Sequence, residues 1–282
     1  MKNILIPTDF SDNAYNALLY ATQLFKNEPS KFYLLYSFED EVSMLTSRVD
    51  IGRSEMVIDD LFKRYNQKLT ELKHAITLDT EGFGHRYEIV ASSKMLTREI
   101  NFLIKGMSID YVIMGTKGLT GAKEVLLGST TVHVIKKIKD CPLLVIPEEI
   151  DYKPLKRIAF ATGFEYPYSD FEIDAITKLA DIDNAMVQIV HIREDEKIAL
   201  DQREHLFQLK EKLAGVQSDI CWLTPGDSKT AAITDFVFSN PVDVLAMIYY
   251  KHGFIKGLFR ESIVKKVGLH PGIPFLMVPS SS

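Results

Sequence analysis

The segment NILIPTDF at residues 3–10 returns in altered form as RIAFATGF at residues 157–164. Two more segments return in the same order and at nearly the same separation along the chain. These pairs are DYVIMG (110–115) with DVLAMI (243–248), and CPLLVIP (141–147) with IPFLMVP (273–279). Because self-similarity at a fixed separation is the signature of repeated units, the chain is predicted to contain two copies of one fold.

The two copies meet near residues 148–156, EEIDYKPLK, a charged stretch with a proline that is typical of a linker. A length of 282 residues also suits two domains of ordinary size. We therefore expect one domain over residues 1–150 and a second over residues 151–282.

Short apolar runs alternate with segments of helical periodicity in the first copy. The expected strands are residues 4–6, 31–38, 85–91, 111–115 and 142–147. One helix is expected to begin with Ser11 as its N-cap, and three more are expected over residues 54–78, 95–106 and 129–140. Strands that alternate with helices are joined by right-handed crossovers in a parallel sheet covered on both faces. The runs rich in Ile, Leu and Val agree with strands buried on both sides. The predicted fold class is α/β, with a doubly wound five-stranded parallel sheet in each copy.

An open sheet of this kind binds ligands beyond the carboxyl ends of its strands, where the strand order reverses. In a sheet of order 3-2-1-4-5, that crevice lies between the first and fourth strands. The residues there would be Pro7, Thr8 and Asp9 after the first strand, and Met114, Gly115 and Thr116 after the fourth. Asp9 suits two roles equally on its chemistry, a turn or capping residue and a carboxylate that accepts hydrogen bonds from a ribose or a base.

A glycine-rich stretch, MGTKGLTGAKEVLLGSTT at residues 114–131, leaves the fourth strand at this crevice. It is not a P-loop, because the Gly-Lys-Ser/Thr string is missing, and the first strand is not followed by a GxGxxG fingerprint. Glycine lets backbone N–H groups approach a ligand, and Ser129 and Thr130 open a helix whose N-terminus favours anions. The spacing alone leaves a phosphate site and an ordinary connection about equally open.

Taken together, ILIPTDFS at the start, DYVIMGTKGLTG after the fourth strand and LLGSTTVHVIKKIKDCPLLVIP resemble the universal stress protein family in its tandem two-domain form. Gly115, Gly118 and Gly128, followed by Ser129, match that family's ATP-binding spacing. The resemblance implies two sheets of order 3-2-1-4-5, similar to the adenine-nucleotide alpha-hydrolases. It also implies that the sheets pair through their last strands about a pseudo-two-fold axis.

The resemblance further implies ATP as the ligand, with any Mg²⁺ arriving together with the nucleotide. Asp9 would hold the ribose or the adenine, Ser37 would lie against the adenine, and the residues that open the last helix would bind the phosphates. The implied binding residues are Pro7, Thr8, Asp9, Ser37, Met114, Gly115, Lys117, Gly118, Gly128, Ser129, Thr130 and Thr131.

The second copy keeps the strand pattern and departs from the first at these positions. Gly163 stands in the place of Asp9, and the run from Arg260 to Ser262 stands in the place of Gly128-Ser129-Thr130. Glu261 in that run would bring a negative charge close to a phosphate, which is unfavourable at short range. We therefore expect no ATP binding in the second copy, which would serve as an intramolecular dimer partner.

The net charge and the lengths of the apolar runs indicate which kinds of partner this chain is not expected to bind. The formal net charge of −5 disfavours a phosphate-backbone footprint, so no nucleic acid partner is expected. No apolar run is long enough to span a bilayer, so no membrane partner is expected and the cytoplasm is the default location. The two cysteines, Cys141 and Cys221, lie far apart without a CxxC pair and are expected to be reduced, buried thiols.

Familiar catalytic and metal-ligating strings, such as HExxH, GxSxG or a paired Cys and His, do not occur, so we assign no catalytic residue and no metal ligand. The chain is predicted to be an ATP-binding regulatory protein of the stress response. It is expected to hydrolyse ATP slowly at most, and the sequence leaves open whether the tandem chain associates with further copies of itself. The alternatives are a nucleotide-independent protein-interaction module, and a weak ATPase or nucleotidyl-transfer enzyme.

Overall fold

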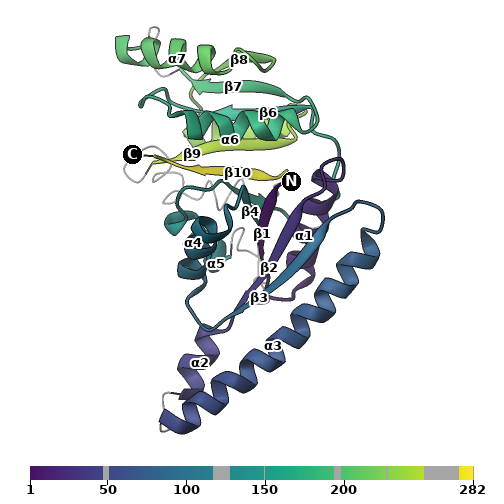
Figure 1. The fold of residues 1–282 in the computed structure, drawn as a ribbon. Helices are drawn as coiled ribbons and strands as arrows, with labels where there is room; N and C mark the ends of the chain where they lie inside the picture. The colour runs from purple at the N-terminus through teal and green to yellow at the C-terminus, as the bar shows by residue number, and fades with distance from the viewer. Residues whose placement is uncertain are drawn as a thin grey trace.

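The computed structural model describes residues 1–46, 51–116, 128–148, 150–193, 198–226, 228–250 and 273–281. These residues form a single ten-stranded sheet with helices on both faces (Figure 1). The strands of the first half are β1 (Asn3–Pro7), β2 (Lys31–Ser37), β3 (Arg86–Ser92), β4 (Tyr111–Gly115) and β5 (Leu143–Ile146). Those of the second half are β6 (Arg157–Ala161), β7 (Met186–Ile192), β8 (Ser218–Leu223), β9 (Val244–Tyr249) and β10 (Phe275–Pro279).

The strand order is β3-β2-β1-β4-β5-β10-β9-β6-β7-β8. Each half therefore has the order 3-2-1-4-5, and all pairs within a half are parallel. The halves join through an antiparallel pair, β5 with β10, in which Leu276 lies opposite Leu144. The predicted fold class and the pairing through the last strands are confirmed. The contact covers an edge of each half that would otherwise be open to a wrong partner.

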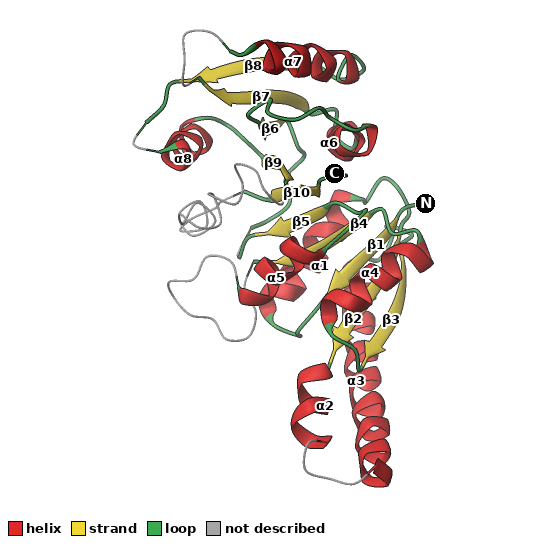
Figure 2. Ribbon diagram, turned by 90° about the vertical axis from the view of Figure 1, so that its left-hand side faces the viewer, coloured by secondary structure: helices red, strands yellow, loops and turns green. Residues whose placement is uncertain are grey.

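The helices divide between the two faces of the sheet (Figure 2). They are α1 (Asp12–Leu24), α2 (Glu39–Thr46), α3 (Ile51–Asp79), α4 (Leu96–Met107), α5 (Ser129–Lys137), α6 (Asp170–Asp181), α7 (Leu200–Lys212) and α8 (Lys229–Ser239). Alternation along β1 explains the division, because side chains of a strand point to opposite faces in turn. Ile4 and Ile6 pack in the core cluster under α1 and α3, whereas Leu5 packs in the cluster under α4 and α5.

Two departures from the sequence-based expectations have simple causes. The helix expected over residues 54–78 begins earlier, at Ile51, and is preceded by the short helix α2. Eight residues do not make a stable helix alone, and α2 depends on packing of Val42 against Phe38 and Tyr65. Cys141 is buried as expected, but Cys221 is only partly buried because β8 is an edge strand of the sheet.

In each half, an aspartate at the equivalent position accepts a hydrogen bond from the backbone of the first strand. The Asn3 N–H donates to Asp110 Oδ2 at 2.8 Å, and the Arg157 N–H donates to Asp243 Oδ2 at 2.8 Å. Asp110 and Asp243 each directly precede the fourth strand of their half. Each one therefore ties the first strand to the fourth. These two strands border the crevice at which a ligand is expected, so the tie holds the two sides of that crevice in register.

His85, just before β3, is held as a neutral ring. Its Nδ1 accepts from the Ser30 N–H at 3.2 Å, and its Nε2 lies 3.0 Å from the Thr22 carbonyl oxygen, to which it donates in the matching tautomer. A second ring proton would face the Ser30 N–H, another donor. Burial lowers the pKa of His85, and the hydrogen bond to Thr22 opposes that shift in part.

We expect the chain to become less stable as the pH falls from about 7.5 to about 5.5, because the unfolded His85, with an ordinary pKa near 6.5, binds a proton that the folded ring resists. The stability is present above that range and is lost as the pH falls through it. Thermal melts of the native chain and of His85→Gln across this range measure the effect. The glutamine amide can keep a donor and an acceptor but cannot titrate, so an equal pH slope in both proteins would contradict the assignment.

Candidate functional site

A cavity of about 90 Å³ lies at the carboxyl ends of β1 and β4. It is lined by Pro7, Thr8, Asp9, Ala14, Leu96, Met114, Gly115, Thr130 and Thr131. Seven of the twelve predicted binding residues are in this lining, brought together from β1, β4 and the first turn of α5. The sequence reasoning missed Ala14 on α1 and Leu96 on α4, which have no polar group to mark them.

The turn after β1 holds Asp9 in a fixed orientation. Phe10 adopts a left-handed backbone with φ of 63°, and its N–H donates to Thr8 Oγ1 at 3.0 Å. Asp9 Oδ1 accepts from the Ser11 N–H at 3.1 Å and from Ser11 Oγ at 2.6 Å. Ser11 Oγ in turn accepts from the Ala14 N–H and so caps α1. Asp9 therefore serves as a turn residue, one of the two roles expected from the sequence, and it also lines the cavity.

Gly115 ends β4 where a side chain has no room. A Cβ at this position would lie 1.8 Å from Asn13 Oδ1 and 3.1 Å from the Asn13 carbonyl oxygen. Asn13 on α1 is only 8% exposed, so its side chain cannot simply swing into solvent. The side-chain amide of Asn13 has no hydrogen-bond partner in the described part of the chain. The close packing of α1 against the end of β4 thus requires glycine and places a buried polar group beside it.

The start of α5 supplies donors and a hydroxyl at the other side of the cavity. Gly128 is the N-cap residue and gives no side-chain cap, and Ser129 is the first helical residue. Thr131 Oγ1 donates to the Gly115 carbonyl oxygen at 3.1 Å and ties α5 to β4. The first N–H groups of a helix lack partners within it and favour a negative charge, so this end of the cavity suits an anion.

Three predicted residues within the described part of the chain are not in the lining. Ser37 ends β2 and donates from Oγ to the Lys94 carbonyl oxygen at 2.6 Å. Gly128 and Ser129 lie next to the cavity in sequence but do not line it. Lys117 and Gly118 lie outside the described residues. Among the described residues, no group of three His, Cys, Asp or Glu side chains is placed to hold a metal ion.

The second half repeats the turn but not the hollow. Phe164 has a φ of 56°, and its N–H donates to Thr162 Oγ1 at 3.3 Å, as Phe10 does to Thr8. In the first half, Phe10 is followed at once by the N-cap Ser11, whereas residues 165–168 intervene before the N-cap Ser169 in the second. The hollow at this position measures only about 20 Å³.

Aromatic side chains fill the corresponding crevice. Tyr166 from the insertion stacks on Tyr250 with ring centroids 4.5 Å apart, and the Tyr168 hydroxyl lies 2.6 Å from Thr162 Oγ1. The Gly163 carbonyl oxygen, in the place of Asp9, accepts from Gln202 Nε2 at 2.9 Å. The loss of Asp9 was identified from the sequence, but the insertion of residues 165–168 was missed. The signal for it was the longer spacing between the end of the strand and the next N-cap.

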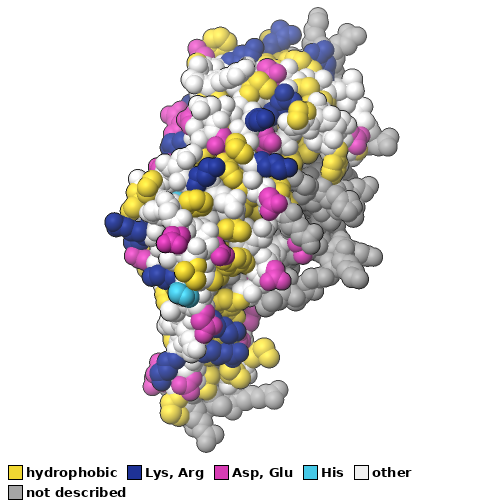
Figure 3. Space-filling model, turned by 90° about the vertical axis from the view of Figure 1, so that its right-hand side faces the viewer, with side chains coloured by type: hydrophobic (Ala, Val, Ile, Leu, Met, Phe, Trp, Pro, Cys, Tyr) yellow, Lys and Arg dark blue, Asp and Glu magenta, His cyan; other side chains and the backbone are white. Residues whose placement is uncertain are grey.

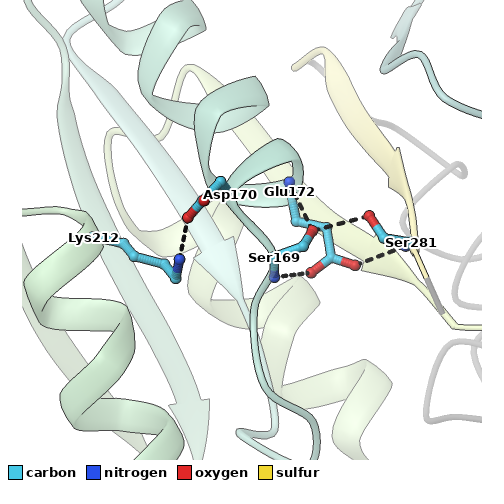
Figure 4. Close-up of polar contacts among 5 residues, drawn as sticks. All are labelled: Ser169, Asp170, Glu172, Lys212 and Ser281. Carbon is cyan, nitrogen blue, oxygen red and sulfur yellow. Dashed lines mark hydrogen bonds and ion pairs between the residues drawn. The ribbon is translucent and has the colours of Figure 1, made fainter.

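The end of the described chain is tied to the start of α6 (Figure 4). The buried carboxylate of Glu172 accepts from the Ser169 N–H at 2.9 Å and from the Ser281 N–H at 3.0 Å, and the Ser169 and Ser281 hydroxyls lie 2.9 Å apart. Lys212 and Asp170 form an ion pair beside them, between α7 and α6. The predicted departures at Arg260, Glu261 and Ser262 lie outside the described residues.

None of the described helices is both long enough and apolar enough to cross a bilayer. The sequence model of the universal stress protein family matches residues 1–147. Among curated relatives, universal stress protein MJ0577 of Methanocaldococcus jannaschii is 31% identical over 157 residues, which cover 51% of this chain and 94% of the relative. Universal stress protein MJ0531 of the same organism is 29% identical over 145 residues, which cover 51% of this chain and 81% of the relative.

The likeness in fold extends over both halves. A solved universal stress protein from Archaeoglobus fulgidus superposes with a TM-score of 0.67 at 17% identity, covering 98% of this chain and 96% of that one. At that identity the superposition establishes the fold alone, and the sequence match over residues 1–147 establishes the family. The chain belongs to the universal stress protein family.

Proposed function

We propose that this chain is a cytoplasmic regulatory protein of the stress response that binds ATP in the cavity between β1 and β4. The observation that carries the proposal is the contrast between the two halves. In the first half Asp9, Gly115 and the start of α5 meet at a cavity of about 90 Å³, whereas the equivalent hollow of the second measures about 20 Å³. The glycine and the carboxylate are kept where a cavity exists and are absent where aromatic rings fill it.

Each side of the cavity suits one part of a nucleotide. Asp9 is a carboxylate held in place by Ser11, and it would accept hydrogen bonds from ribose hydroxyls. The N-terminus of α5 would bind phosphate oxygens, with the Thr130 hydroxyl as a further donor. The volume is smaller than the roughly 300–1,000 Å³ of typical ligand pockets, so the cavity would seat only the sugar. Base and phosphates would extend from it, and any Mg²⁺ would arrive on the phosphates.

The second half would then act as a permanent partner within the chain. We propose two domains, residues 1–150 and 151–282, of which only the first binds nucleotide. The filled crevice around Tyr166 and Tyr250 supports this division of roles. Calorimetric titration of the full chain with ATP is expected to give one site per chain, and two equivalent sites would overturn the assignment to the first half.

ATP at about 100 times its Kd is expected to stabilise the chain by about 2.7 kcal/mol, which raises the Tm by about 5–10 °C in a protein of this size. Asp9→Ala removes a charged acceptor, which costs about 1.5–3 kcal/mol of binding and weakens ATP affinity by roughly 10- to 100-fold. Asp9→Asn retains an acceptor for Ser11, so it separates loss of the charge from loss of the hydrogen bonds that orient Ser11. Thermal-shift titrations with ATP, AMP and buffer measure both effects.

Asp174→Ala, on the exposed face of α6 beside Lys178, is the control and is expected to leave the ATP shift unchanged. A native chain that shows no shift with ATP or AMP would favour the nucleotide-independent interaction module. Stoichiometric conversion of ATP during the titration would instead favour a hydrolytic or transferase role. Equal shifts in the native chain and in Asp9→Ala would place the ligand elsewhere.

A further inference from the structure

The helices α2 and α3 form a hairpin that projects beyond the edge of the sheet (Figures 1 and 2). It lies in the connection between β2 and β3, which spans 48 residues, whereas 25 residues connect β7 to β8. The second half completes the same five-strand order with α7 in this connection. The fold therefore needs one helix in this connection, a role that Leu69 and Ile76 of α3 serve in the main core, but it does not require α2 or the part of α3 that projects beyond the sheet.

The root of the hairpin is packed and tied down. Phe38, Leu61 and Tyr65 are buried in a small core of their own. The Tyr65 hydroxyl donates to Glu41 Oε1 on α2, and the Tyr36 hydroxyl on β2 donates to the same oxygen at 3.4 Å. Glu41 thus joins α2, α3 and the sheet. The hairpin presents a surface with a defined geometry, because its two helices are fixed to each other and to the sheet.

Large apolar side chains gather at the free end of this hairpin. Met44 and Leu45 on α2 are 75% and 50% exposed, and Met56 on α3 is 62% exposed. Hydrophobic and charged side chains are mixed on the narrow projection at the lower end of the molecule in Figure 3. The small core at the root is completed by Val42 and Val57, which are partly buried against it. Methionine is a flexible, polarizable side chain that is common on surfaces that bind apolar segments of partners.

The free end of the hairpin is acidic, whereas the whole hairpin, residues 39–79, contains nine acidic and six basic residues and has a formal net charge of −3. Residues 39–62 contain seven acidic and two basic residues, a formal net charge of −5 that equals the net charge of the whole chain. The rest of the chain is therefore formally neutral. Asp40, Glu55 and Asp59 are exposed acidic side chains on the described part of this segment. A surface that is apolar and negative together suits a partner that is apolar and positive.

We propose that the free end of the α2–α3 hairpin is a docking surface for a positively charged amphipathic segment of another protein. Such a segment would place apolar side chains on Met44, Leu45 and Met56 and its Lys or Arg side chains among the acidic residues. Nucleic acids and anionic membranes carry the same sign of charge as the hairpin and are repelled. A second copy of the chain would bring one acidic free end, residues 39–62 with a formal net charge of −5, against another, so self-docking through this surface is disfavoured.

The probe is a fluorescent synthetic peptide of about 18 residues with leucine at helical i, i+3, i+4 spacing and lysine elsewhere. Its binding to the full chain is followed by anisotropy at low and at physiological salt. We expect Met44→Ser with Met56→Ser to weaken binding by about tenfold or more, as for apolar anchors of an interface. Glu55→Gln with Asp59→Asn is expected to weaken binding and to reduce its dependence on salt.

The matched control is Leu200→Ser with Phe207→Ser on α7, where the side chains are 80% and 62% exposed but belong to the second half. We expect the control to change the affinity less than twofold. Equal weakening by the control, no binding by the native chain, or equal binding of a leucine–glutamate peptide would overturn the proposal. A native dimer in sedimentation that the methionine variants abolish would assign the surface to a second copy instead. Thermal melts establish that all variants are folded.

Discussion

Gly115→Ala is expected to destabilise the chain by about 1–3 kcal/mol, the usual cost of overpacking, and to abolish the stabilisation by ATP. The added Cβ would lie 1.8 Å from Asn13 Oδ1 and 3.1 Å from the Asn13 carbonyl oxygen. Asn13 is buried, so either its side chain or the start of α1 must move. That movement displaces the turn that holds Asp9, at the opposite side of the cavity. Denaturant unfolding and ATP titration of the variant measure the two losses separately.

Gly106→Ala provides a matched control within the same half. Gly106 lies near the end of α4, and a Cβ there would meet no atom within 4 Å. Alanine is the better helix former, so this variant is expected to be neutral or more stable by about 0.5–1 kcal/mol and to keep the ATP shift. The close approach of α1 to β4 would be contradicted if Gly115→Ala behaved like Gly106→Ala.

Leu276→Asp is expected to destabilise the pairing of the two halves by at least about 4 kcal/mol, because it buries an unpaired charge. Leu276 is 0% exposed and lies opposite Leu144, which is 1% exposed, at the antiparallel join of β5 and β10. Both leucines belong to a core cluster that runs through the two halves. Denaturant unfolding, followed by circular dichroism, would show the loss as an earlier transition.

Leu276→Met keeps the volume and the apolar character and is expected to cost less than about 1.5 kcal/mol. If the aspartate and methionine variants unfolded within 1 kcal/mol of each other, the join would not carry the stability assigned to it. Retention of ATP binding by the aspartate variant would indicate that the first half folds without its partner.

Most of the sheet could be predicted from the sequence because its signal is local. The runs of Ile, Leu and Val mark strands buried on both faces, and their repetition reveals two copies of one unit. The helix α2 escaped prediction because its stability depends on Phe38 and Tyr65, which become its neighbours only in the folded chain. The precise extent of α3 was missed for the same reason.

The candidate site was predictable where its chemistry is polar or its backbone needs glycine. Asp9, Gly115, Thr130 and Thr131 carry such signals and do line the cavity. Ala14 and Leu96 line it as well but look like any other helical core positions. The filling of the second crevice depends on four inserted residues and on a stack between Tyr166 and Tyr250. The stack joins residues far apart in the sequence, so the loss of Asp9 could be seen in advance but the stack could not.

The join of β5 and β10 has a consequence for how the proposed ligand could act. Because one chain supplies both halves, their effective concentration is fixed by the linker and not by the amount of protein in the cell. Dilution cannot separate them, and a ligand in the cavity cannot act by promoting or preventing their encounter. The assembly always contains one open cavity and one filled crevice. If a nucleotide binds as proposed, its effect on other molecules would have to come from a change in the shape or charge of this linked pair.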